Sequence, residues 1–263
     1  MDPNTDGRQA AASAPVPSLL APWMWALCGT GCGLVLWVAL SSALLRGGDG
    51  IPRALVELQA WALGLGALLA AAGLGLLWPR PAAPGAWWRR SLMALLTVIA
   101  SALVLALLQW RPQPDPTWPT SLAVLACGSA LAAILGLALL EQAQAGLLVP
   151  ARLAQALLCG ATLLFAMLAL LWSGPLPEAG PVPSLLLLVA VAGGLLAAAR
   201  HGQGGLFPWQ QWRRRWLALG LLVAVPLLLA ALLYLQPGWG RVIWSLVALS
   251  VFAGTLVERL PSR

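Results

Sequence analysis

The stretch SLMALLTVIASALVLALLQW, at residues 91–110, decides the fold. It contains 20 residues, and none of them is charged. A helix of this length extends about 30 Å at about 1.5 Å per residue, which matches the hydrocarbon core of a bilayer. We therefore expect this stretch to cross a membrane as a single helix.

Seven further stretches of the chain have the same character. They are residues 23–44, 54–78, 120–140, 150–172, 183–199, 216–235 and 241–257. Their apolar runs are continuous rather than alternating, and lipid offers no partner to a bare peptide group, so helices are expected and barrel strands are not. The composition agrees, with 60% hydrophobic and 9% charged residues and a mean hydropathy of +0.86. The sequence predicts an all-α, polytopic integral membrane bundle of about eight transmembrane helices.

The domain organisation expected from this pattern is simple. Residues 1–22 are rich in Ala, Pro and polar side chains and lack the basic region of a secretory signal, so we expect a flexible N-terminal tail. Residues 23–263 are expected to form one transmembrane helical domain. The first span is long for the apolar segment of a signal peptide, and we expect it to be retained.

The distribution of basic residues predicts the orientation of the chain. All 15 basic residues are Arg. If the spans alternate, 11 of them lie on one side, namely Arg8, Arg80, Arg89, Arg90, Arg152, Arg200, Arg213, Arg214, Arg215, Arg259 and Arg263. The other side holds four, namely Arg46, Arg53, Arg111 and Arg241. Because cytoplasmic loops carry the excess of Arg, both termini are expected in the cytoplasm.

The net charge of +7 does not require a nucleic acid partner. Topology and contact with anionic lipid headgroups account for most of the excess, so membrane lipids are the expected partners of these loops. A docking surface for an acidic protein is the alternative interpretation of the Arg-rich loops.

Small residues within the spans predict close helix packing. Gly29 and Gly33 are four residues apart in the first span, as Ala67 and Ala71 are in the second. Pro226 is expected to kink the seventh span, with neighbouring groups satisfying the lost hydrogen bond.

The chain offers few groups for metal, haem or proton chemistry. The four cysteines, Cys28, Cys32, Cys127 and Cys159, all lie within spans and are expected to pack as small apolar residues, with a redox or disulfide role as the alternative. A single histidine, His201, cannot supply the paired axial ligands of a membrane haem, so we expect neither haem nor metal in this chain. The acidic residues lie near span ends or in loops, which argues against a proton pump or a charge-coupled transporter.

Several segments resemble a known family. The run DPTWPT at residues 115–120 leads into LACGSAL at residues 125–131, and the whole stretch 110–140 resembles the membrane anchor subunit of dimethyl sulfoxide reductase-like molybdoenzymes. The run GTGCGL at residues 29–34 is similar to that family's first helix, and VFAGTLVER at residues 251–259 resembles its last helix. The run WPRP at residues 78–81, followed by AW at residues 86–87, is similar to a family loop.

This resemblance implies a function and a set of partners. The chain would anchor an iron–sulfur electron-transfer subunit and a molybdopterin catalytic subunit in the bacterial inner membrane, and would oxidise a quinol, menaquinol or ubiquinol, for them. The chain departs from the family at two places: the family's histidine is replaced in the Leu77–Trp78 region, and the acidic residue of its third helix is missing from residues 91–100. The orientation predicted from Arg is also the reverse of the family's usual one.

A quinol ring would have to lie near an interface, where protons can leave. The residues expected to bind it are Trp78, Arg80, Trp87, Arg89 and Arg90. Indoles offer flat surfaces to the ring, and guanidinium groups donate hydrogen bonds to its oxygens. The alternative for these residues is an aromatic belt with a topology signal. The alternatives for the whole chain are a small-solute or lipid transporter and a structural membrane subunit without a redox role.

Overall fold

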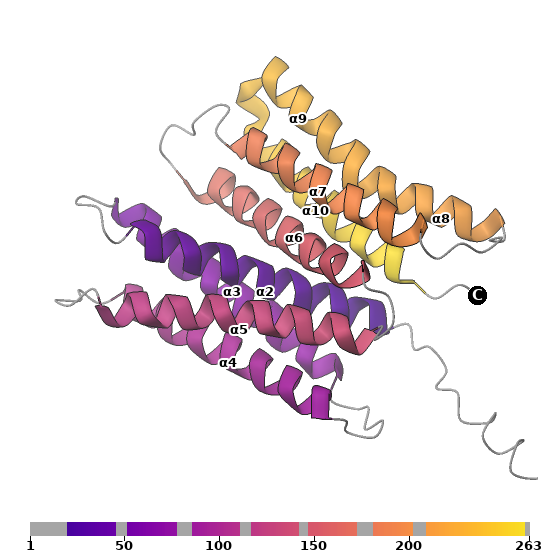
Figure 1. Cartoon of the computed structure of the whole chain (residues 1–263). Helices are drawn as coiled ribbons and strands as arrows, with labels where there is room; N and C mark the ends of the chain where they lie inside the picture. Colours follow the sequence, from indigo (N-terminus) through magenta and orange to yellow (C-terminus); the bar gives the residue numbers. More distant parts are fainter. Residues whose placement is uncertain are drawn as a thin grey trace, which may run out of the picture.

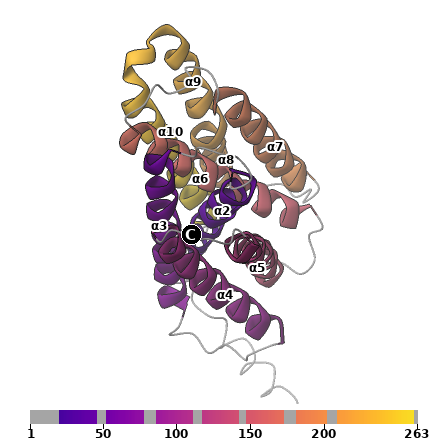
Figure 2. The same ribbon diagram turned by 90° about the vertical axis from the view of Figure 1, so that its left-hand side faces the viewer.

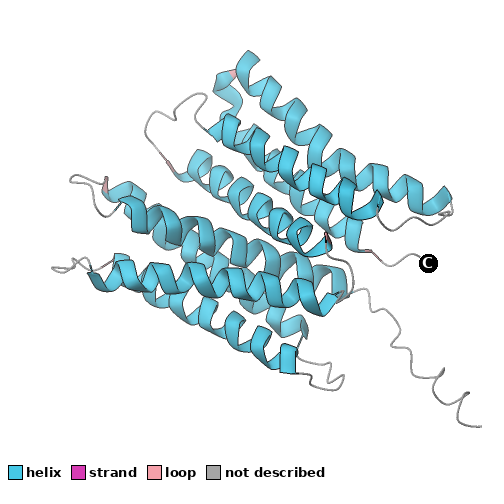
Figure 3. Cartoon of the chain, viewed as in Figure 1, coloured by secondary structure: helices cyan, strands magenta, loops and turns pink. Residues whose placement is uncertain are grey.

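The computed structural model describes residues 20–45, 52–77, 86–110, 117–141, 147–172, 181–201 and 209–260. Every element assigned in this part of the chain is a helix (Figure 3). The helices are α2 (Leu20–Leu45), α3 (Arg53–Leu77), α4 (Ala86–Gln109), α5 (Thr117–Glu141), α6 (Leu148–Leu171), α7 (Pro181–His201), α8 (Trp209–Leu219), the π-helix η1 (Gly220–Ala224), α9 (Val225–Leu235), the 3₁₀ turn η2 (Pro237–Trp239) and α10 (Gly240–Arg259).

The eight predicted spans are confirmed as eight helices long and apolar enough to cross a membrane. The seventh span consists of α8, η1 and α9, which follow one another without a break. The first helix begins at Leu20, three residues before the predicted start at position 23. The chain is a multi-pass membrane protein, and residues 1–19 of the expected tail lie outside the described residues.

Prolines stand in the first turns of four helices, where they do not disturb the hydrogen bonding. They are Pro22 in α2, Pro119 in α5, Pro150 in α6, and Pro181 and Pro183 in α7. The first four N–H groups of a helix have no partner within it, so the N–H that Pro lacks costs nothing there. These positions let each span begin directly after its loop.

The bundle has two halves of four spans each. One apolar core joins α2, α3, α4 and α5 with one face of α6, and a second joins the other face of α6 with α7, α10 and the seventh span. The two groups lie side by side, with α6 next to α2 (Figure 1). In the turned view α2 lies near the centre, and it packs against α3, α5 and α6 (Figure 2).

The two halves meet at a close contact between α2 and α6. A Cβ placed on Gly33 would lie 2.0 Å from the carbonyl oxygen of Ala156, and one on Gly160 would lie 2.2 Å from the carbonyl carbon of Gly33. Only glycine allows the two backbones to approach so closely. Trp37 adds a hydrogen bond at the same interface, from its indole nitrogen to the carbonyl oxygen of Leu157 at 2.9 Å.

The seventh span contains a π-helical turn directly before Pro226. Pro226 has no N–H for the preceding turn, and the widened turn Gly220–Ala224 absorbs this defect. Ser250 of α10 donates a hydrogen bond of 2.7 Å to the carbonyl oxygen of Leu221, within this turn. A neighbouring helix therefore satisfies part of the disturbed backbone, as the sequence predicted.

Candidate functional site

Of the five residues predicted to bind quinol, the structure describes the side chains of Arg89 and Arg90. Trp78 and Arg80 lie outside the described residues, and Trp87 belongs to α4 but its side chain is not described. Arg89 and Arg90 lie in the first turns of α4, and both are exposed. The structure thus locates two of the five side chains, and the site remains a prediction.

The start of α4 is fixed against α5 directly after these arginines. Ser91 is buried, and a Cβ on Gly136 would lie 2.5 Å from the Ser91 hydroxyl oxygen. Close packing at this point leaves Arg89 and Arg90 on the exposed side of the helix end. An exposed guanidinium group, such as that of Arg89, can donate hydrogen bonds to a headgroup, a quinol oxygen or a partner protein.

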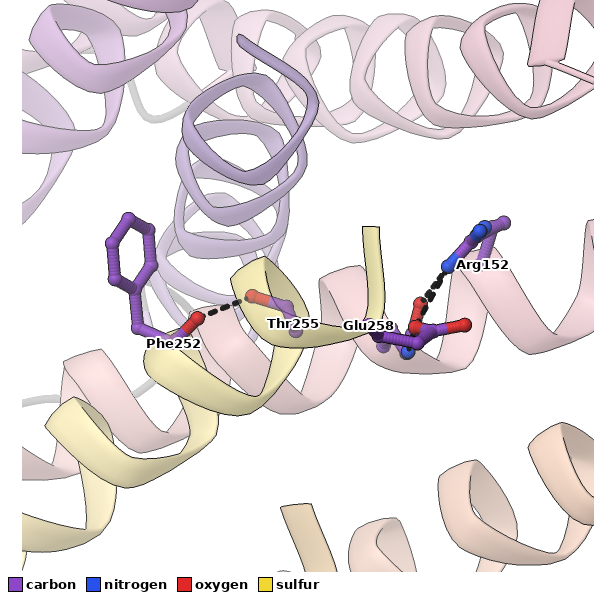
Figure 4. A network of polar contacts seen from close by, with 5 residues as sticks. Arg152, Phe252, Thr255 and Glu258 are labelled. Atoms are coloured by element: carbon purple, nitrogen blue, oxygen red, sulfur yellow. Dashed lines mark hydrogen bonds and ion pairs between the residues drawn. The ribbon is translucent and has the colours of Figure 1, made fainter. Parts of the chain in front are cut away.

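A polar cluster of Arg152, Gln155 and Glu258 joins α6 to α10. The Nη1 of Arg152 donates to the Oε2 of Glu258 at 2.8 Å and to the Oε1 of Gln155 at 2.9 Å. The amide nitrogen of Gln155 also donates to the Oε2 of Glu258. Figure 4 shows Arg152 and Glu258 facing each other across the two helices.

All three side chains of the polar cluster are buried. The side chains of Arg152 and Glu258 are 9% and 2% exposed, and Gln155 is 2% exposed. Because an unpaired charge in a low-dielectric environment costs several kcal/mol, each charged group here depends on the other. The polar cluster is therefore a buried, mutually hydrogen-bonded group, in contrast to an ion pair on the surface.

A second guanidinium lies beside the polar cluster. The Cζ of Arg259 is 5.8 Å from the centre of the Trp25 ring, a distance at which a cation is attracted to the face of an indole. This contact joins the start of α2 to the end of α10. Together with the Arg152–Glu258 pair, it brings the beginnings of α2 and α6 to the end of α10.

A small cavity, here named the junction cavity, lies among α2, α5, α6 and α10. Its volume is about 30 Å³, which is more than the roughly 10–15 Å³ that a cavity needs to hold one water molecule. The residues around it are Trp25, Ala26, Gly29, Thr30, Ile134, Leu137, Ala138, Arg152, Gln155, Ala156, Cys159, Thr255 and Arg259. The cavity thus has polar groups on the α6 and α10 sides and the hydroxyl-bearing Thr30 on the α2 side, whereas its α5 side is apolar. Its size suits water rather than a ring.

Sequence reasoning missed this polar cluster. It counted Arg152 only as a topology signal, whereas the structure shows an ion pair between Arg152 of α6 and Glu258 of α10. One signal was present in the sequence, since Arg152 and Gln155 are three residues apart and so share a helix face. Nothing in the sequence indicated that the carboxylate of α10 faces α6.

The cysteines and acidic residues of the described helices are dispersed. Cys28, Cys32 and Cys159 are buried, Cys127 is half-buried, and none of the four forms a disulfide. Within the described ranges, no three His, Cys, Asp or Glu side chains come together in a group that could hold a metal ion. The expectation of a chain without metal or haem stays a prediction.

Comparisons of the chain with family models, with curated proteins and with solved structures find no match in any of the three.

Proposed function

We propose that this chain is the membrane anchor subunit of a molybdopterin oxidoreductase complex of the bacterial inner membrane. It oxidises a membrane quinol to the quinone, which releases two protons and two electrons. The electrons pass to an iron–sulfur subunit and from there to the catalytic subunit. The chain itself is the quinol-binding and anchoring part of the complex.

The observation that carries this proposal is the convergence of the resembling segments. The run at residues 29–34 contributes Thr30 to the junction cavity, and the run at residues 251–259 contributes Thr255 and Arg259. The stretch at residues 110–140 borders the same cavity through Ile134 and Ala138. Three segments that are far apart in the sequence, each resembling the same family, therefore surround one place at one end of the bundle.

The proposal separates the place of the ring from the place of the polar cluster. A quinol ring does not fit a cavity of about 30 Å³, so we assign the ring to the group predicted from the sequence, Trp78, Arg80, Trp87, Arg89 and Arg90. The polar cluster holds the helix ends together on the same side of the bundle.

Purification of the full-length chain in mild detergent tests the proposal. We expect an iron–sulfur subunit and a molybdopterin subunit to co-purify with it, in stoichiometric amounts. A chain that is recovered alone from its native host, and that binds no quinol analogue, would refute the anchor function.

Substitutions test the residues assigned to the ring. Arg80→Ala and Trp87→Ala are expected to weaken the binding of a fluorescent quinol analogue at least five-fold. Trp239→Ala is the matched control, because Trp239 is an exposed tryptophan at the opposite end of the bundle. Equal loss in all three variants would indicate a general effect on the aromatic belt.

One observation favours a second function, a small-solute or lipid transporter. The π-helical turn Gly220–Ala224 precedes Pro226, and π-turns within helices often occur at functional sites. Such a segment can change its register when a substrate passes. Uptake of labelled solutes or scrambling of labelled lipids by proteoliposomes, in the absence of any partner subunit, would support this function over the first.

A further inference from the structure

Two adjoining hollows lie along the first half of the seventh span, at α8 and the π-helical turn η1. The first, of about 360 Å³, lies between α7 and the seventh span and is bordered by Gly193, Gly194, Trp216, Gly220 and Val223, among others. The second, of about 460 Å³, follows the seventh span itself, from Arg213 past Trp216 and Gly220 to Val225. Trp216 and Gly220 border both hollows, so the two hollows adjoin at these residues.

Glycines create the space in these hollows. A Cβ on Gly194 or on Gly220 would meet no atom within 4 Å, whereas one on Gly193 would lie 2.8 Å from Val223. Gly193 therefore packs closely against Val223, where α7 meets the seventh span. Gly194 and Gly220 have no protein atom over their missing side chains, and this leaves the hollows open. The π-helical turn begins at Gly220, so the irregular part of the span lies beside both hollows.

The chemistry along the hollows changes with depth. Arg213 is exposed at the end of the span that the arginine count assigns to the cytoplasm, and the exposed Trp216 follows one turn deeper. The remaining residues around the second hollow, Leu217, Gly220, Leu221 and Val225, are apolar or lack a side chain. From Arg213 to Val225 the helix extends about 18 Å, twelve residues at about 1.5 Å each, which is close to half the thickness of the hydrocarbon core.

We propose that these hollows bind one anionic phospholipid of the cytoplasmic leaflet. The guanidinium group of Arg213 binds the phosphate and the negatively charged headgroup. The indole of Trp216 lies at the level of the ester groups, where tryptophan is favoured. The two acyl chains occupy the two hollows, one in each, and the hollows adjoin at Trp216 and Gly220. The bound lipid lies against the π-helical turn, whose Leu221 also accepts the hydrogen bond from Ser250 of α10.

This proposal concerns a site that is separate from the ring-binding residues and the polar cluster. Anionic lipids are concentrated in the cytoplasmic leaflet, so the charge of Arg213 matches the lipid that is present at that depth. The site does not depend on the function of the chain as an anchor subunit.

Native mass spectrometry of the full-length protein tests the proposal. The protein in mild detergent is offered equal amounts of phosphatidylglycerol and phosphatidylcholine with the same acyl chains. We expect one phosphatidylglycerol to be retained about five-fold better than phosphatidylcholine, the factor that one arginine near an anionic headgroup provides. Equal retention of the two lipids would overturn the proposal.

Two variants with matched controls locate the site. A Cβ at Gly220 would meet no protein atom within 4 Å, so Gly220→Leu places a side chain in the hollows and should abolish retention of both lipids. Gly128→Leu, at an equally open glycine of α5, should leave it unchanged. Arg213→Gln should lower the retention of phosphatidylglycerol to that of phosphatidylcholine, whereas Arg241→Gln, at the other end of the bundle, should not.

The lipid-binding test can still be made if the Gly220→Leu protein fails to fold. Gly194→Leu fills the first hollow from α7 and is used if Gly220→Leu unfolds, with helix content followed by circular dichroism. If a folded Gly220→Leu or Gly194→Leu protein retains phosphatidylglycerol as well as the Gly128→Leu control does, the lipid does not bind in these hollows.

Discussion

The carboxylate of Glu258 is buried at the end of its span and is stabilised there by partners on another helix. It accepts hydrogen bonds from Arg152 and from Gln155, both on α6. The sequence allowed the prediction that Glu258 lies near a span end, since the apolar run stops there. Its partner could not be predicted, because Arg152 is 106 positions away and many arginines were available at the same end of the bundle.

Removal of the Glu258 carboxylate alone is expected to lower the free energy of unfolding. Glu258→Leu leaves the buried guanidinium of Arg152 without this acceptor, and we expect the free energy of unfolding to fall by about 3–5 kcal/mol. The double variant Arg152→Met/Glu258→Leu should recover most of the loss, because apolar replacement of a whole buried pair is often neutral. Titration with a denaturing detergent measures both values, and a double variant as unstable as the single one would contradict this account.

Gly33 and Gly29 illustrate a second limit of prediction at the scale of the residue. Their spacing of four residues predicted close packing for both, and the structure shows backbone contact only at Gly33, whereas a Cβ on Gly29 would lie 3.7 Å from the Cβ of Ala156, an ordinary contact. Spacing identifies a helix face but not the point where two axes come closest.

The two glycines give a matched pair of variants. Gly33→Ala places a methyl group against the backbone of Ala156, and we expect it to lower the free energy of unfolding by about 1–3 kcal/mol or more. Gly29→Ala, one turn away on the same helix, should change it by less than about 1 kcal/mol. Similar losses in both variants would show that the helices do not meet at Gly33.

At the scale of the element, all eight spans were predicted to within a few residues, because length and lack of charge identify them directly. The π-helical turn in the seventh span was not predicted. Pro226 indicated a disturbed helix, but the form of the disturbance depends on Ser250, which lies on another helix and donates to Leu221. Local sequence cannot specify an element whose geometry is completed by a neighbour.

Ser250 is therefore expected to stabilise the seventh span. Ser250→Ala removes the donor to the Leu221 carbonyl and should lower the free energy of unfolding by about 1 kcal/mol, the usual size of a hydrogen bond between membrane helices. Ser245→Ala is the control, because the Ser245 hydroxyl donates only to the carbonyl of Arg241 in its own helix. Hydrogen exchange of the seventh span should rise in the first variant and stay constant in the second.

At the scale of the whole molecule, the sequence predicted the class of the fold but not its arrangement. Each span is apolar around most of its circumference, since both lipid and protein neighbours are apolar, and so the sequence does not reveal which faces meet. The structure places α2 at the centre and divides the chain into two groups of four spans. This arrangement brings the ends of α2, α6 and α10 together around the junction cavity.

Accessibility of introduced cysteines tests the central claim most directly. The four native cysteines lie within spans, so a membrane-impermeant maleimide should report on one cysteine placed in each loop. We expect labelling from outside the cell for cysteines that replace Asp49, Gln113, Ser173 and Gln236 in turn. Cysteines that replace Ala83, Gln144 and Gln203 should be labelled only after the cells are permeabilised. Two neighbouring loops labelled from the same side would contradict eight membrane-spanning helices, and a fully reversed pattern would contradict the orientation inferred from arginine.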